Sequence, residues 1–71
     1  MNLLKGYRNA LGMTQADMAS ELGISRQSYY MKEKGRVAFT DKEKIIVLSL
    51  FHKIDEKLTI DQIFFTHKVG K

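Results

Sequence analysis

Two adjacent long polar side chains, Arg26 and Gln27, follow Ser25 at the start of a predicted helix. An arginine can donate two hydrogen bonds to O6 and N7 of guanine, and a glutamine can pair with adenine in a similar bidentate way. Tyr30 and Met31 lie at the spacing that brings them to the same outward side of this helix. These four side chains could therefore contact the edges of base pairs. The alternative is an ordinary solvated helix face.

A second group of residues could hold the phosphates of a nucleic-acid backbone, which fix register and affinity but not sequence choice. One of them lies at a predicted helix N-terminus, where free N–H groups and the positive end of the helix dipole attract anions. Two others are cations, one at the end of the next predicted helix and one just after it. For Thr14 and Ser25, helix capping alone is an equally good explanation. The candidate phosphate contacts are Thr14, Gln15, Ser25, Lys34 and Arg36.

Two short helices joined by a tight turn at Gly23 must position these side chains. Thr14 is the predicted N-cap of the first helix, with Asp17 three residues on in a capping-box-like pair. The second helix is predicted from about Ser25 to Lys34, since Gly35 is a natural helix end. Apolar residues should pack on the inward sides of both helices, namely Met18, Ala19, Leu22, Ile24 and Tyr29.

Three further helices are predicted around this pair. The first covers about Asn2 to Leu11. A capping box at Thr40 and Glu43 opens the next, and Thr59 with Gln62 opens the last. Because the apolar run from Ile45 to Phe51 has no partner strand, the chain is predicted to be all-α with five helices. Apolar residues recur at helical spacing or in short runs after both capping pairs, at Ile46, Val47, Leu50, Phe51, Ile54, Ile63, Phe64 and Phe65.

Composition limits the function classes. The 71 residues make one domain, with a net charge of +4 that favours polyanionic partners. No segment approaches the length of a membrane span, and neither a signal peptide nor a cysteine is present, which fits a cytoplasmic protein. His52 and His67 lack partners at metal-ligand spacing and are expected to be solvated. Without a catalytic constellation or a glycine-rich phosphate loop, no enzyme activity, cofactor or small-molecule ligand is expected.

The ordered set of motifs resembles the phage-repressor/Cro-type helix-turn-helix family, also called the xenobiotic-response-element (XRE) class. The resemblance covers about residues 3–65 and implies a compact, lambda-repressor-like five-helix domain whose members bind operator DNA, mostly as dimers. The residues that carry it are Arg8, Gly12-Met13-Thr14-Gln15, Met18-Ala19, Leu22-Gly23-Ile24-Ser25, Glu33-Lys34-Gly35 and the run from Thr59 to Phe64.

The resemblance also implies an ion pair between Arg8 and Glu33, which would join the first helix to the third. The alternative is two solvated charges. Lys32 departs from the family pattern, which usually has an apolar core residue at this position. We expect Lys32 to lay its methylenes over Tyr29 and extend its ammonium group to water, where it would add a positive charge near the DNA backbone.

The resulting hypothesis is a small, phage-related or bacterial transcription regulator that binds double-stranded operator DNA as a homodimer. It predicts a DNA-binding domain over residues 1–65 and a short basic tail over 66–71, which contains Lys68 and Lys71. Surplus apolar residues could form the dimer contact together with the tail, or all could be core: Val47, Leu50, Phe51, Phe64 and Phe65.

Two other interpretations stay open. A protein-interaction module of the same fold, such as an antitoxin-like or adaptor protein, would not need the pair Arg26 and Gln27. The chain could also be the DNA-binding half of a longer repressor, against which the start at Met1 argues mildly.

Overall fold

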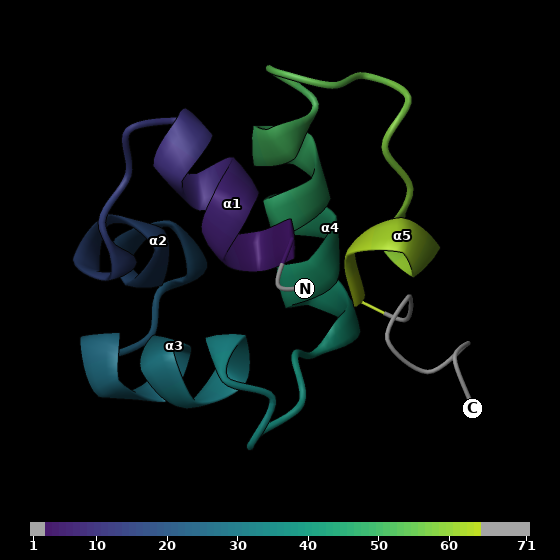
Figure 1. Ribbon diagram of the computed structural model, residues 1–71. Coiled ribbons are helices and arrows are strands. Elements are labelled where there is room, and N and C mark those ends of the chain that lie inside the picture. Colours follow the sequence, from purple (N-terminus) through teal and green to yellow (C-terminus); the bar gives the residue numbers. More distant parts are fainter. Residues whose placement is uncertain (1–2, 65–71) are drawn as a thin grey trace.

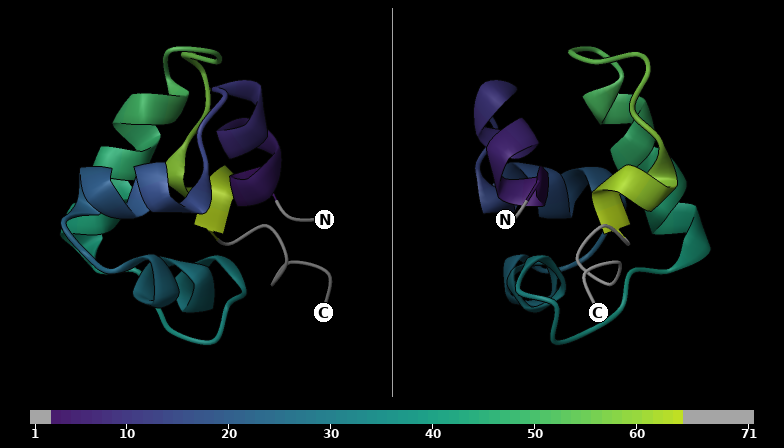
Figure 2. Two further views of the ribbon diagram at one scale, coloured as in Figure 1. Left: turned by 90° about the vertical axis from the view of Figure 1, so that its left-hand side faces the viewer. Right: turned by 45° about the vertical axis from the view of Figure 1, so that its right-hand side comes forward.

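The computed structural model describes residues 3–64, which form five α-helices and no strand. The predicted all-α, five-helix architecture with a helix-turn-helix at the second and third helices is confirmed. Figure 1 shows α1 between α2 and α3 on one side and α4 and α5 on the other. In every view α3 is the lowest helix, with α2 directly above it (Figure 2). The helices are α1 (Leu3–Ala10), α2 (Gln15–Leu22), α3 (Arg26–Glu33), α4 (Asp41–Phe51) and α5 (Ile60–Phe64).

Local hydrogen bonds determine where α2 begins and ends. The Thr14 hydroxyl oxygen accepts from the Asp17 amide at 3.0 Å, and the Asp17 carboxylate accepts from the Thr14 amide at 2.8 Å. This reciprocal pair is the predicted capping box, and it satisfies two N–H groups that the helix itself cannot. Gly23 ends α2 in the left-handed backbone conformation, with φ of 71°. Residues other than glycine rarely adopt this conformation. The chain thereby turns sharply into α3.

The hydrophobic core takes buried side chains from all five helices, among them Leu4 of α1 and Phe64 of α5. Its largest fully buried side chains are Tyr29, Phe51, Met18 and Val47. The Tyr7 ring stacks on Phe51, with ring centroids 5.2 Å apart. Core packing therefore holds α3 from behind, through Tyr29, and leaves the opposite side of the helix exposed.

The surplus apolar residues of the last two helices are mostly core. Val47 and Phe51 are fully buried and Phe64 is buried, while Leu50 is half-buried against the same cluster. These buried side chains cannot also form a dimer contact, whereas Phe65 lies outside the described residues. Ile54, one of the apolar residues that recur at helical spacing, lies beyond the end of α4 at Phe51 and is 47% exposed.

Two polar residues differ from their predictions. Lys32 was expected to reach water, but its ammonium group is buried and bonds to Glu43 on α4. His52 was expected to be solvated, but its ring lies partly buried, with Nε2 2.8 Å from the Leu58 carbonyl oxygen. Both partners come from other elements, so helical periodicity alone could not reveal them. His67, Lys68, Lys71 and Asn2 lie outside the described residues.

No helix within residues 3–64 combines the length and apolar character that crossing a membrane requires.

Candidate nucleic-acid interface

The outward side of α3 begins with Arg26 and Gln27, both of which are exposed. Ser25 caps the helix: its hydroxyl oxygen accepts from the Ser28 amide at 3.0 Å, so the two long side chains project from the first helical turn. Among residues 3–64, neither side chain forms a hydrogen bond or an ion pair. The fold therefore makes no use of their polar groups, which remain available to an external ligand.

Farther along α3, Tyr30 and Lys34 form a contact of their own. The Lys34 ammonium lies 5.6 Å from the centroid of the Tyr30 ring, within range of a cation–π interaction. Both residues are exposed, with Tyr30 at 38%. Met31, the fourth predicted base contact, is only half-buried, so part of its side chain reaches the surface.

The candidate phosphate contacts lie on both sides of α3. Thr14 and Ser25 are exposed, and both hydroxyl oxygens accept the capping hydrogen bonds described above. Arg36 is exposed in the loop between α3 and α4, where its amide donates to the Met31 carbonyl at 2.9 Å. Gly35, with φ of 83°, allows the turn that leads into this loop.

Behind this surface, one carboxylate collects hydrogen bonds from three helices. Arg8 Nε donates to Glu33 Oε2 at 2.8 Å, and Arg8 Nη2 donates to Glu33 Oε1 at 3.2 Å. The Tyr29 hydroxyl donates to Oε2 at 2.8 Å, and Gln15 Nε2 donates to Oε1 at 3.0 Å. We call Arg8, Gln15, Tyr29 and Glu33 the Glu33 cluster. It contains the ion pair that the resemblance implied, together with a bond from Gln15 that sequence reasoning missed.

The electrostatics of the Glu33 cluster favour its charged form. Burial by itself would raise the pKa of the Glu33 carboxyl, but the bonds from Arg8, Gln15 and Tyr29 outweigh it and lower that pKa below its ordinary value. The bond to Glu33 raises the pKa of Arg8. Burial, followed by the bond to Glu33, raises the pKa of the Tyr29 hydroxyl. Arg8 and Glu33 are therefore both charged at neutral pH.

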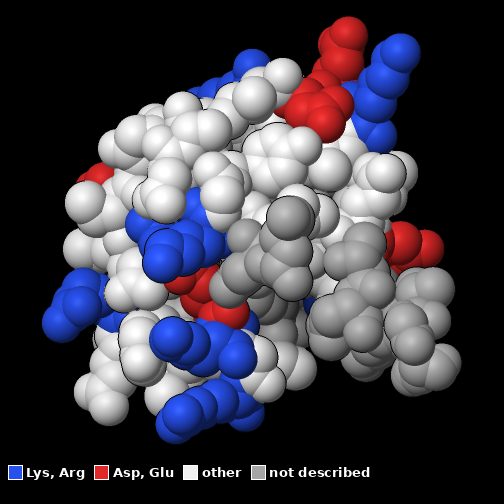
Figure 3. Space-filling view, in the orientation of Figure 1, with Lys and Arg blue, Asp and Glu red and all other residues white. Residues whose placement is uncertain are grey.

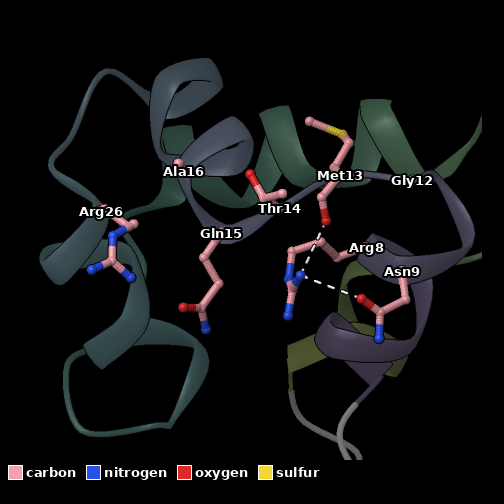
Figure 4. A pocket seen from close by; sticks show the side chains of 8 residues that line it. All are labelled: Arg8, Asn9, Gly12, Met13, Thr14, Gln15, Ala16 and Arg26. Carbon is pink, nitrogen blue, oxygen red and sulfur yellow. Dashed lines mark hydrogen bonds between the residues drawn. The ribbon is translucent and has the colours of Figure 1, made fainter.

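A hollow opens beside the Glu33 cluster, where the end of α1 meets the starts of α2 and α3. Figure 4 shows Gln15 between Arg8 and Arg26 in this hollow. Arg8 is held there by the Met13 carbonyl, which accepts from Nη1 at 3.0 Å. Lys and Arg side chains gather on the part of the surface that carries α3 and the loop after it (Figure 3). The positive charge and the positive end of the α2 dipole suit an anionic ligand.

A helix-turn-helix family model matches residues 4–49, more than half of the chain. The chain belongs to the XRE/Cro-type helix-turn-helix family. No curated protein and no solved structure matches the chain. The matched range covers α1 to most of α4, and so includes the helix-turn-helix and the whole Glu33 cluster. This helix-turn-helix protein is thus a member of a DNA-binding regulatory family rather than of an enzyme family.

Proposed function

We propose that this helix-turn-helix protein is a sequence-specific transcription regulator, a small repressor or Cro-like protein that places α3 in the major groove of double-stranded DNA. The observation that carries the proposal is the state of Arg26 and Gln27: both are exposed on the first turn of α3, and neither is used by the described fold. An α-helix fits the major groove, where each base pair presents a distinct set of donors and acceptors.

In this proposal Arg26 contacts a guanine and Gln27 an adenine, each through two hydrogen bonds. A good bidentate pair discriminates against the wrong base by about 1–3 kcal/mol. Tyr30 and Met31 add contacts farther along the groove, where a ring edge or a thioether can meet a thymine methyl group.

The phosphates are held from both sides of the groove. Gln15 donates one amide N–H to Glu33 and has a second for a phosphate oxygen. The amides at the start of α2 lie next to it. Lys34 and Arg36 supply the positive charge at the other end of α3. Thr14 and Ser25 complete the set, because a capping hydroxyl can still donate its own hydrogen.

We infer further that the protein acts as a homodimer on DNA. One helix-turn-helix unit contacts few base pairs, so specificity is gained when two units bind half-sites about 34–36 Å apart. In this assignment residues 1–65 form the DNA-binding domain and residues 66–71 a basic tail. A cytoplasmic regulator of phage or bacterial origin fits this mode of action.

Selection of bound duplexes from a random DNA pool tests the proposal, followed by titration of the selected site at several salt concentrations. The expected result is an enriched, nearly palindromic site, with affinity that falls steeply as salt increases. Sedimentation of the protein with and without the selected duplex tests the homodimer. Equal affinity for all sequences would contradict sequence-specific regulation, and binding to no duplex would favour a protein-interaction module of the same fold.

A further inference from the structure

Arg8 lies in the wall of the hollow between α1, α2 and α3, but its guanidinium group is committed to the fold. Nε and Nη2 donate to the Glu33 carboxylate, and Nη1 donates to the Met13 carbonyl. The Arg8 side chain is only 9% exposed, and Glu33 compensates its charge. Arg8 therefore shapes the hollow, and an anion bound there must be held mainly by the other side chains that line it.

Asn9, on the last turn of α1, is an exposed polar residue in the wall of the same hollow. Arg8 Nη1 donates to Asn9 Oδ1 at 3.4 Å (Figure 4). Because an arginine N–H can only donate, Oδ1 and not Nδ2 of the carboxamide faces Arg8. Within residues 3–64 no hydrogen bond uses Nδ2. Its two N–H bonds are therefore available to an acceptor outside the fold.

The Gln15 carboxamide, in the same hollow, is held in the opposite sense. Its Nε2 donates to Glu33 Oε1 at 3.0 Å, which leaves one N–H bond for a phosphate. Figure 4 shows Arg8 between Gln15 and Asn9. The Arg8–Glu33 ion pair thus orients one carboxamide through its anion and the other through its cation. Both carboxamides keep N–H donors for a ligand of the hollow.

The other polar side chains of the hollow already have a role. The Thr14 hydroxyl oxygen caps α2, and Arg26 contacts a guanine in the proposed function. The remaining lining residues, Gly12, Met13 and Ala16, have no side-chain donor. The Nδ2 donors of Asn9 are thus used neither by the described fold nor by the proposed DNA contacts.

We infer that Asn9 is a further phosphate contact, which donates from Nδ2 to a backbone phosphate of the DNA bound at this hollow. The inference rests on the proposed function. It adds a residue of α1 to a contact surface otherwise formed by α2, α3 and the loop after α3. A neutral donor to a phosphate contributes affinity without sequence preference, because every nucleotide carries the same phosphate.

The first test is Asn9→Ala, which removes the donors at an exposed position and should unfold at the same urea concentration as the wild type. Its affinity for the selected duplex and for an unrelated duplex should fall several-fold, by the same factor. The slope of log affinity against log salt should not change, because it depends on the phosphates neutralised by cations. Ser49→Ala, at an exposed position of α4, is the control and should bind as the wild type does.

Duplexes with a neutral methylphosphonate at one position locate the contact. Each phosphate of the half-site is replaced in turn, and the wild type is compared with Asn9→Ala and Gln15→Ala. At the phosphate that Asn9 contacts, the replacement should weaken binding of the wild type several-fold more than binding of Asn9→Ala. Because Asn9 and Gln15 line one hollow, this phosphate should be the one that responds to Gln15→Ala or its neighbour on the same strand.

Wild-type affinity of Asn9→Ala, or a response only at a remote phosphate, would overturn the inference and leave the proposed function intact. If the wild-type protein binds no duplex, the proposed function fails, and titration with inorganic phosphate tests Asn9 separately. The side-chain amide signals of Asn9 and Gln15 in the NMR spectrum should then shift together as phosphate is added. An Asn9 signal that does not shift would overturn the inference.

Discussion

The two sides of α3 use polar side chains in opposite ways. On the inner side Tyr29, Lys32 and Glu33 are buried, and each is bonded to a side chain of the described fold. On the outer side Arg26 and Gln27 are exposed and bonded to none. No buried side-chain nitrogen or oxygen within residues 3–64 lacks a hydrogen-bond partner.

This difference separates folding from binding along a single helix. Buried charges are costly to leave unpaired, so the inner side is constrained by stability. Exposed polar residues contribute little to stability, so the outer side can vary with the ligand. Substitutions on the inner side of α3 should therefore change the free energy of unfolding. Substitutions on the outer side should change the affinity for DNA.

The largest expected effect is that of Glu33→Ala. It leaves the Arg8 guanidinium without its carboxylate and removes the acceptor of Tyr29 and Gln15, which should lower the free energy of unfolding by about 3–5 kcal/mol. Urea denaturation measures this change. Glu21→Ala, on the exposed side of α2, should change it by less than about 0.5 kcal/mol. A small loss for Glu33→Ala would mean that the cluster does not support the fold.

Next in size is the effect of Arg26→Ala on sequence preference. The variant should keep the stability of the wild type and lose about 1–3 kcal/mol of discrimination for guanine at one position of each half-site. Binding to duplexes with each of the four base pairs at that position measures the loss. Lys53→Ala removes the same charge away from α3 and should leave discrimination intact. Altered stability of Arg26→Ala would contradict the division between the two sides.

Arg36→Ala should have a smaller and different effect. Because a phosphate contact carries no sequence information, the variant should bind all duplexes more weakly by a similar factor. Its salt slope should decrease in magnitude by about 1. Titration of the selected site and of an unrelated duplex at several salt concentrations distinguishes the two kinds of contact. A change in base preference would mean that Arg36 contacts the bases rather than the phosphate backbone.

The smallest expected effect is a decrease in the free energy of unfolding at low pH. The pKa of Glu33 is lowered from its ordinary 4.5 in the folded protein, so its contribution is complete above that pH. The contribution is lost as the pH falls from 4.5 through the lowered pKa, because over this range the unfolded state binds a proton that the folded state does not. Thermal unfolding between pH 7 and 2 should show this fall, and Glu33→Gln should flatten it. An equally steep fall in Glu33→Gln would assign the acid sensitivity to other carboxylates.

The elements determined by local sequence could be predicted. The pairs Thr14 with Asp17 and Thr40 with Glu43 are three residues apart, and both form the expected capping boxes. Gly23 ends α2 where the turn was expected, since the left-handed conformation depends on the residue itself. The pairing of Arg8 with Glu33, 25 residues apart, came from the family resemblance rather than from local pattern.

Two of the contacts that sequence reasoning missed join residues far apart in the sequence. Gln15 and Glu33 are 18 residues apart, and Lys32 and Glu43 are 11 apart across a loop. No periodicity relates such positions, because their distance depends on how whole helices pack. The prediction for Lys32 failed for a further reason. A lysine at a core position was assumed to extend to water, whereas the carboxylate that caps α4 had capacity for a second donor.

The most direct test of the account is the binding of a duplex in which the guanine assigned to Arg26 is replaced by 7-deazaguanine. This base lacks only the N7 acceptor, so one of the two proposed hydrogen bonds is lost. The wild-type protein should bind the modified duplex several-fold more weakly than the normal one, while Arg26→Ala should bind both equally. Equal losses for the two proteins, or no loss for the wild type, would contradict contact between Arg26 and that guanine.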